Sequence, residues 1–282
     1  MEDNTVQLAE INFKLRKLEA EEQKLLFDKH FLSRSTKEMA AGGISKLQSK
    51  IPDKLEETLR KAMKGAFRTV FDNGRYFIDK TYSDKTLRDE YADKRFFAQT
   101  GRKRSREGRV SRSQRRYAGE VGFTTVKGVG LGIVGIGLPD VPVLIAELIR
   151  ICSVSAKSHG FCVERQDEQV YMLRLIRLAA ASVDERMILS AELDSLSDII
   201  DKGETAGCHI DEEIDKTADT LTIAMLVSRF VMGVSIVGVA GGLYDTVIVS
   251  RMHRLAEIEY EKRLQQKCKA DILRQLHQEP NV

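Results

Sequence analysis

Side chains that commonly perform catalysis or bind metals are few and scattered in this sequence. None of its four cysteines belongs to a C-x-x-C pair, their spacing fits no zinc template, and the five histidines are dispersed along the chain. The adjacent pair Cys208–His209 does not by itself make a metal site or a nucleophile–base pair. The motifs G-x-S-x-G and H-E-x-x-H are absent. We therefore expect no catalytic residues, no metal site and no cofactor, and thiols that stay reduced in the cytosol.

One glycine motif imitates a nucleotide-binding loop. Residues 130–135 read GLGIVG, which satisfies G-x-G-x-x-G. Dinucleotide binding also requires a preceding strand, a long helix that starts within the motif, and an acidic residue about 20 positions later. Here Gly137 and Pro139 would end such a helix almost at once, and no alternation of strands and helices surrounds the motif. We therefore expect no dinucleotide cofactor.

Charge is concentrated in two regions of a chain that is nearly neutral as a whole. The 282 residues contain 45 Lys+Arg and 42 Asp+Glu, a formal net charge of only +3. Residues 102–116, the basic segment, carry +7, and residues 192–219, the acidic window, carry −8. A dense basic segment attracts phosphate groups of anionic lipid or of nucleic acid, unless it is simply a solvated loop. Its basic residues are Arg102, Lys103, Arg104, Arg106, Arg109, Arg112, Arg115 and Arg116.

Two apolar segments, residues 121–151 and 221–249, approach the length of a membrane-spanning helix. Such a helix needs about 20 mainly apolar residues with few charges. A Pro-Asp-x-Pro break at residues 139–142 interrupts the first segment, and Arg229 and Asp245 lie within the second. We therefore expect buried helices, or helical hairpins that dip into one leaflet, in place of simple spanning helices.

Helical periodicity dominates the rest of the chain. Helices are predicted at about residues 5–31, 53–70, 163–183, 187–200 and 246–276, with one or two more between residues 76 and 100. Asp53 is the predicted cap of the second helix, with Glu56 completing a capping box. No stretch shows the sustained period-2 alternation of strands. The sequence therefore predicts an all-α, multi-helix bundle.

The first predicted helix is amphipathic, with a short stripe of apolar residues at coiled-coil-like spacing. We expect residues 1–33 to form an N-terminal amphipathic helix and residues 34–282 to form the main helical domain. The helix is expected to pack against its own domain, and a homodimer formed through it is the alternative.

Eleven of the 20 glycines lie in two apolar windows, residues 119–137 and 233–242, which resemble each other at an offset of 105 residues. Each window leads into Gly-Leu-x-Asp, in which the glycine is expected to end one helix and the aspartate to cap the next. The sequence thus predicts two glycine-rich apolar helical hairpins, related as an internal repeat and packed about a pseudo-twofold axis. Chance similarity is the plain alternative. The hairpin motif comprises Gly128, Gly132, Gly137, Leu138, Pro139, Asp140, Pro142, Gly238, Gly242, Leu243 and Asp245.

Residues 128–150, GVGLGIVGIGLPDVPVLIAELIR, followed by SHGF, resemble the signature of the EcsC protein family. Residues 230–263, with their Gly-Gly and basic exit, resemble the family's C-terminal helix, and a weaker likeness extends back to about Phe31. The resemblance implies a membrane-associated protein. The family takes its name from a bacterial operon that also encodes ABC-transporter subunits, and it has no agreed catalytic residues that could be assigned to this chain. Helix capping is sufficient to explain why Asp140 and Asp245 are aspartates.

These observations favour a non-enzymatic, cytoplasmic protein that associates peripherally with the membrane and assists transport, secretion or envelope processes. The expected partner is an anionic membrane surface or an integral membrane protein, met through the basic segment and the hairpins. One alternative is a lipid- or peptide-directed hydrolase built around Asp140, Asp245, Arg229 or a histidine. Another is a nucleic-acid binder, although only Tyr117 adjoins the basic segment as an aromatic and no recognition signature accompanies it.

Overall fold

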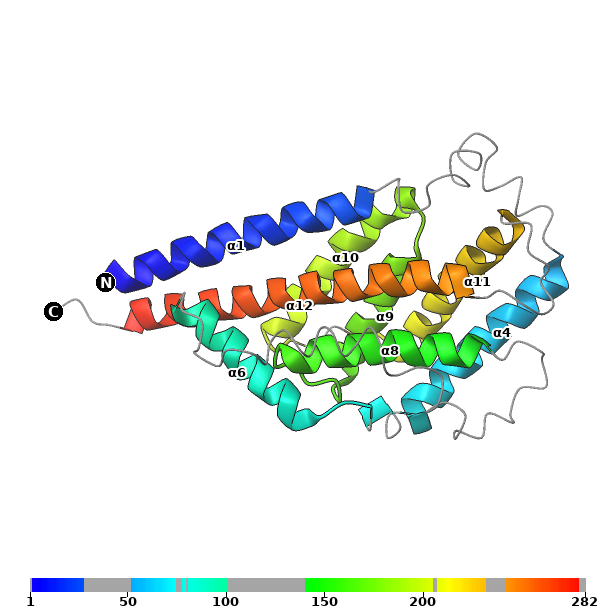
Figure 1. Cartoon of the computed structure of the whole chain (residues 1–282), viewed down its shortest axis with the longest axis horizontal. Helices are drawn as coiled ribbons and strands as arrows, with labels where there is room; N and C mark the ends of the chain where they lie inside the picture. Colours follow the sequence, from blue (N-terminus) through cyan, green and yellow to red (C-terminus); the bar gives the residue numbers. More distant parts are fainter. Residues whose placement is uncertain are drawn as a thin grey trace.

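The computed structural model of the chain describes residues 2–27, 52–74, 78–79, 81–100, 140–204, 207–231 and 242–278. The regular structure of these residues is entirely helical, which confirms the predicted all-α class (Figure 1). The elements are α1 (Glu2–Phe27), α4 (Asp53–Thr69), the π-helical turn η2 (Val70–Gly74), α6 (Asp84–Thr100), α8 (Asp140–Ser158), α9 (Gln166–Ala180), α10 (Val183–Asp201), α11 (Ile210–Val231) and α12 (Gly242–Gln278).

The last helix organises the bundle. Helix α12 has 37 residues, so it is about 55 Å long. It packs against α1, α6, α8, α9, α10 and α11, and Figure 1 shows it running along most of the molecule. Leu255, Ala256 and Tyr260, near its middle, are completely buried. This single helix therefore contributes side chains to most of the interior.

Helices α8 and α12 lie side by side and run in the same direction. The charges of Glu147 and Arg150, in the middle of α8, act on His253 of α12, and His159, just after α8, meets Glu261 further along α12. The beginnings of the two helices therefore lie at the same end of the bundle. Figure 1 shows the C-terminal end of α11 at this end as well.

The predicted capping box at the start of α4 is wrong. Pro52 is the N-cap residue, with an extended backbone and no side-chain capping bond, so Asp53 is already the first helical residue. Proline suits this boundary because it has no N–H to donate and its φ is fixed. Glu56 instead accepts a hydrogen bond from Arg60 Nη2 at 2.6 Å. The apolar face predicted for this helix is confirmed, since Leu59, Met63 and Phe67 are buried.

The acidic window is neutralised in part by residues on other helices. Three of its aspartates on α11 form a ladder of ion pairs with α4, spaced one helical turn apart. These pairs are Arg60–Asp219 at 3.0 Å, Lys64–Asp215 at 3.1 Å and Arg68–Asp211 at 3.2 Å. Other carboxylates of the window contact basic residues on α9 and α12. The described contacts thus give these acidic groups partners within the fold.

A glycine follows the end of α8. The last residue of this helix is Ser158, and Gly160 has φ +82°, a backbone conformation that favours glycine. A Cβ atom at this position would overlap the ring of Tyr91 on α6. The turn therefore brings α6 close to the end of α8, beside His159.

Candidate functional site

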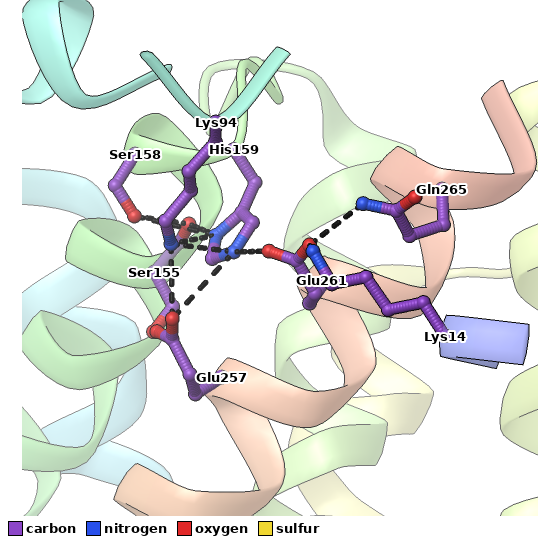
Figure 2. Close-up of polar contacts among 8 residues, drawn as sticks. All are labelled: Lys14, Lys94, Ser155, Ser158, His159, Glu257, Glu261 and Gln265. Carbon is purple, nitrogen blue, oxygen red and sulfur yellow. Dashed lines mark hydrogen bonds and ion pairs between the residues drawn. The ribbon is translucent and has the colours of Figure 1, made fainter. Parts of the chain in front are cut away.

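Three helices and the turn after α8 contribute ionisable side chains to a cluster at the end of α8 (Figure 2). His159 follows α8 directly, and Glu257 and Glu261 lie one turn apart on α12. Lys94 enters from α6 and Lys14 from α1. His159 is completely buried at its side chain, whereas the side chain of Glu257 is 45% exposed. The cluster is thus anchored in the interior and open to solvent on one side.

The imidazole, both carboxylates and one ammonium group converge on a small volume. His159 Nε2 lies 3.1 Å from Glu261 Oε2 and 3.8 Å from Glu257 Oε1. Lys94 Nζ lies 2.6 Å from the same imidazole nitrogen and 2.9 Å from Glu257 Oε1. The other oxygen of Glu261 pairs with Lys14 and accepts a bond of 2.8 Å from Gln265 Nε2.

The backbone fixes the orientation of the imidazole ring. His159 Nδ1 lies 2.6 Å from the carbonyl oxygen of Ser155, one turn earlier on α8. A carbonyl oxygen only accepts hydrogen bonds, so Nδ1 carries a proton and donates it. The other ring nitrogen, Nε2, is thereby aimed at Glu257 and Glu261, as Figure 2 shows.

Both carboxyl groups are held in their charged form. Burial alone would raise the pKa of Glu261, but its hydrogen bond from His159 and the charges of Lys14 and Lys94 lower the pKa well below its usual value. Burial is also outweighed at Glu257, where Lys94 and His159 lower the pKa. At neutral pH the cluster therefore presents two carboxylates to the cations around them.

Chemically, the cluster offers one imidazole nitrogen and two carboxylate oxygens within 4.8 Å of one another. This donor set is suited to binding a cation. The same contacts also connect α1, α6, α8 and α12 through a largely buried network of charges.

The sequence predictions did not include this site. The one signal available was the spacing of the two glutamates, four residues apart and hence on one face of a helix. Their meeting with His159, about a hundred residues earlier in the chain, depends on how α8 and α12 pack.

The structure gives little information about the residues singled out from the sequence. The basic segment lies outside the described residues, as do Gly128, Gly132, Gly137, Leu138, Pro139 and Gly238. Asp140 is the first residue of α8, and Pro142 lies in the first turn of that helix. Gly242, Leu243 and Asp245 lie in the first turn of α12, so Asp245 is inside that helix and not in front of it. The side chains of Asp140, Arg229 and Asp245, proposed for a hydrolase site, are outside the described part of the chain.

Among the described residues, no helix combines the length and the apolar character that crossing a membrane requires.

Comparison with known proteins gives one positive result. The model of the EcsC protein family matches residues 13–264. This range includes the glycine-rich windows, the basic segment and Lys14, Lys94, His159, Glu257 and Glu261 of the cluster. No curated protein and no solved structure was found to match the chain. Because the family model covers most of the 282 residues, the chain belongs to the EcsC protein family.

Proposed function

We propose that this EcsC-family protein is a non-enzymatic accessory to transport, secretion or envelope processes. In this proposal it resides in the cytoplasm and docks peripherally on an anionic membrane surface or on an integral membrane protein. The basic segment supplies electrostatic attraction, and the two glycine-rich windows supply apolar contact.

One observation carries the proposal: the helices that follow the two glycine-rich windows begin at the same end of the bundle. The first window leads into α8 and the second leads into α12, and these helices run in the same direction. Two apolar segments far apart in sequence are therefore attached to one end of the molecule. A single surface at that end can contact both, which favours docking through this end.

The ion pairs of the acidic window support the electrostatic part. Aspartates 211, 215 and 219 have partners on α4, so these carboxylates are engaged within the fold. This pairing supports the proposal that the charge of the basic segment is available to a partner outside the chain. Each Lys or Arg near an anionic membrane contributes roughly 1 kcal/mol before salt screening.

Co-sedimentation with vesicles tests the proposal. The full chain is mixed with vesicles of phosphatidylglycerol and phosphatidylcholine, or of phosphatidylcholine alone, at increasing salt. A variant with all eight basic residues of the segment changed to Gln is compared with a control in which eight exposed basic residues of the described helices and loops are changed to Gln. The control positions are Arg16, Lys17, Lys24, Lys54, Lys61, Lys85, Arg88 and Lys202. The two variants have the same formal charge, so only the location of the lost charge differs.

We expect the natural chain and the control to bind anionic vesicles, and the segment variant to bind at least roughly tenfold more weakly. Binding that persists at 0.5 M salt, where the Debye length is only about 4 Å, would indicate apolar contact as well. An equal loss of vesicle binding in the segment variant and the control would contradict the proposal. Recovery of the natural chain in the supernatant at low salt would contradict it as well. Loss of RNA or DNA binding with unchanged vesicle binding would favour the nucleic-acid alternative.

A further inference from the structure

We propose that His159, Glu257 and Glu261 form a binding site for one divalent first-row transition ion, which displaces the ammonium group of Lys94. His159 contributes Nε2, and each glutamate contributes a carboxylate oxygen. This site is independent of membrane docking, so either proposal can fail without the other.

The first argument is a conflict of hydrogen bonding at His159 Nε2. Because Nδ1 donates to Ser155, Nε2 is the ring nitrogen that is left to bond with the carboxylates. If Nε2 carries a proton, it can donate to Glu261 at 3.1 Å, but its N–H then points at the Lys94 ammonium at 2.6 Å, which is also a donor. If Nε2 carries a lone pair, it can accept a bond from Lys94, but it then faces the lone pairs of Glu261. No protonation state of the ring suits both neighbours.

A metal ion removes this conflict. It bonds to the lone pair of Nε2 and to both carboxylates, and it needs no proton on any of them. In a tetrahedral site with bonds of about 2.1 Å, neighbouring ligand atoms lie roughly 3.4 Å apart. The distances from Nε2 to the two carboxylate oxygens are 3.1 and 3.8 Å, close to this spacing, and all three donor atoms lie within 4.8 Å of one another.

The hydrogen bond from Nδ1 to Ser155 is the second argument. Metal-binding histidines usually donate their other N–H to a carboxylate, a carbonyl or a water, which fixes the tautomer and the direction of the ligand nitrogen. The Ser155 carbonyl does this for His159 at 2.6 Å. The buried ring also contacts Tyr260 with its plane inclined by 22°, so its position is held by packing as well.

The donor set defines the class of ion. Carboxylate oxygens alone would suit Mg²⁺ or Ca²⁺, which prefer all-oxygen sites. An imidazole nitrogen combined with two carboxylates suits Zn²⁺, Mn²⁺ or Fe²⁺. The site should therefore prefer Zn²⁺ and Mn²⁺ over Mg²⁺.

Lys94 can leave the cluster without unfolding it. Its side chain is 24% exposed and that of Glu257 is 45% exposed, so solvent reaches this side of the site. Lysine has a flexible four-carbon stem and a strongly hydrated head group. When an ion binds, the ammonium group can move into solvent and leave Glu257 free to act as a ligand.

The test is direct binding of Zn²⁺, Mn²⁺ and Mg²⁺ to the full chain, measured by calorimetry and by metal content after dialysis. We expect one Zn²⁺ or Mn²⁺ per chain and much weaker Mg²⁺ binding. His159→Gln, Glu257→Gln and Glu261→Gln should each weaken Zn²⁺ binding by about 100-fold or more, because each removes one ligand. The matched controls lie on α12 outside the cluster. His253→Gln removes a histidine, as His159→Gln does, and Asp271→Asn removes one negative charge, as each glutamate variant does. Both should bind Zn²⁺ as the natural chain does.

Lys94→Met separates a metal site from a simple network of ion pairs. If Lys94 competes with the ion, its removal should tighten Zn²⁺ binding by roughly tenfold. If the natural chain does not bind Zn²⁺, the proposed site is overturned. It is also overturned if Glu257→Gln and His159→Gln bind Zn²⁺ with unchanged affinity. Unchanged affinity in a folded Lys94→Met variant would overturn the displacement of Lys94. Glu257→Gln keeps the test valid if the buried His159 variant does not fold, since the Glu257 side chain is half-exposed.

Discussion

Gly160 is a single residue on which the position of α6 depends. Its φ of +82° disfavours any side chain, and a Cβ atom would overlap the ring of Tyr91. We expect Gly160→Ala to lower the free energy of unfolding by about 2–4 kcal/mol, because backbone strain and overpacking add. Urea denaturation followed by circular dichroism would measure the loss.

Gly203 provides a matched control for this substitution. It has nearly the same φ, +81°, but no atom lies within 4 Å of a Cβ built there. Gly203→Ala should therefore cost only about 1 kcal/mol, from backbone strain alone. If the two substitutions were equally destabilising, contact with Tyr91 would not be the reason for glycine at position 160.

The sequence could not predict which individual charged side chains are buried. The later part of α12 is strongly charged in sequence, yet Glu259, Lys262 and Arg263 are buried. The guanidinium of Arg263 forms two bonds with Glu168, at 2.8 and 3.0 Å, and lies over the ring of Phe161 at 4.1 Å. These partners come from distant parts of the chain, so local composition could not indicate them. The His159 cluster was missed for the same reason.

At the scale of elements, the ladder between α4 and α11 makes a specific prediction. Changing Arg60, Lys64 and Arg68 to Glu puts like charges opposite one another at three positions. We expect the free energy of unfolding to fall by about 2–3 kcal/mol, since each exposed pair contributes 0.2–1 kcal/mol and is replaced by repulsion. Urea denaturation at low and high salt would measure this, with the larger effect at low salt.

A charge swap provides the control. Changing Asp211, Asp215 and Asp219 to Lys in the same chain restores three opposite pairs in reversed order. This combined variant should regain most of the lost stability. If its loss equalled the sum of the two triple substitutions, the ladder would not account for the effect.

Helical periodicity predicted the elements better than their ends. The helices predicted at residues 163–183 and 187–200 correspond to α9 and α10, but α10 begins at Val183, four residues early. Ser182 and Glu185 explain the difference, because the Ser182 backbone N–H donates to the Glu185 carboxylate at 3.3 Å in a capping box. The capping box was instead expected at Asp53, where Pro52 defines the boundary. Periodicity reports which residues face the core, whereas a helix end depends on one or two local bonds.

At the scale of the whole molecule, α1 packs along the second half of α12. Ile11 and Leu15 share a small apolar cluster with Leu264, Cys268 and Ile272. We expect Ile11→Ala combined with Leu15→Ala to lower the free energy of unfolding by about 4–8 kcal/mol, because two buried side chains are truncated. Thermal or urea unfolding would measure the effect.

The opposite face of α1 offers a control and a test of the predicted homodimer. Val6 and Phe13 are 57% and 72% exposed and lie two turns apart on one face. Val6→Ala combined with Phe13→Ala should change stability of the monomer by less than about 0.5 kcal/mol. The homodimer through α1 stays a prediction, and sedimentation equilibrium would test it. A dimer that persists in this variant would not use that face.

The length of α12 also sets how far the His159 cluster would stand from a docked membrane. Glu257 and Glu261 are 15 and 19 residues from Gly242, the first residue of α12, which is roughly 22–28 Å along the helix axis. The surface potential of a membrane decays over a Debye length of about 8–10 Å at physiological salt. A protein docked through that end would hold the cluster beyond this range. Its ion would then be drawn from the bulk cytoplasm, and its affinity should be the same whether the lipid is anionic or neutral.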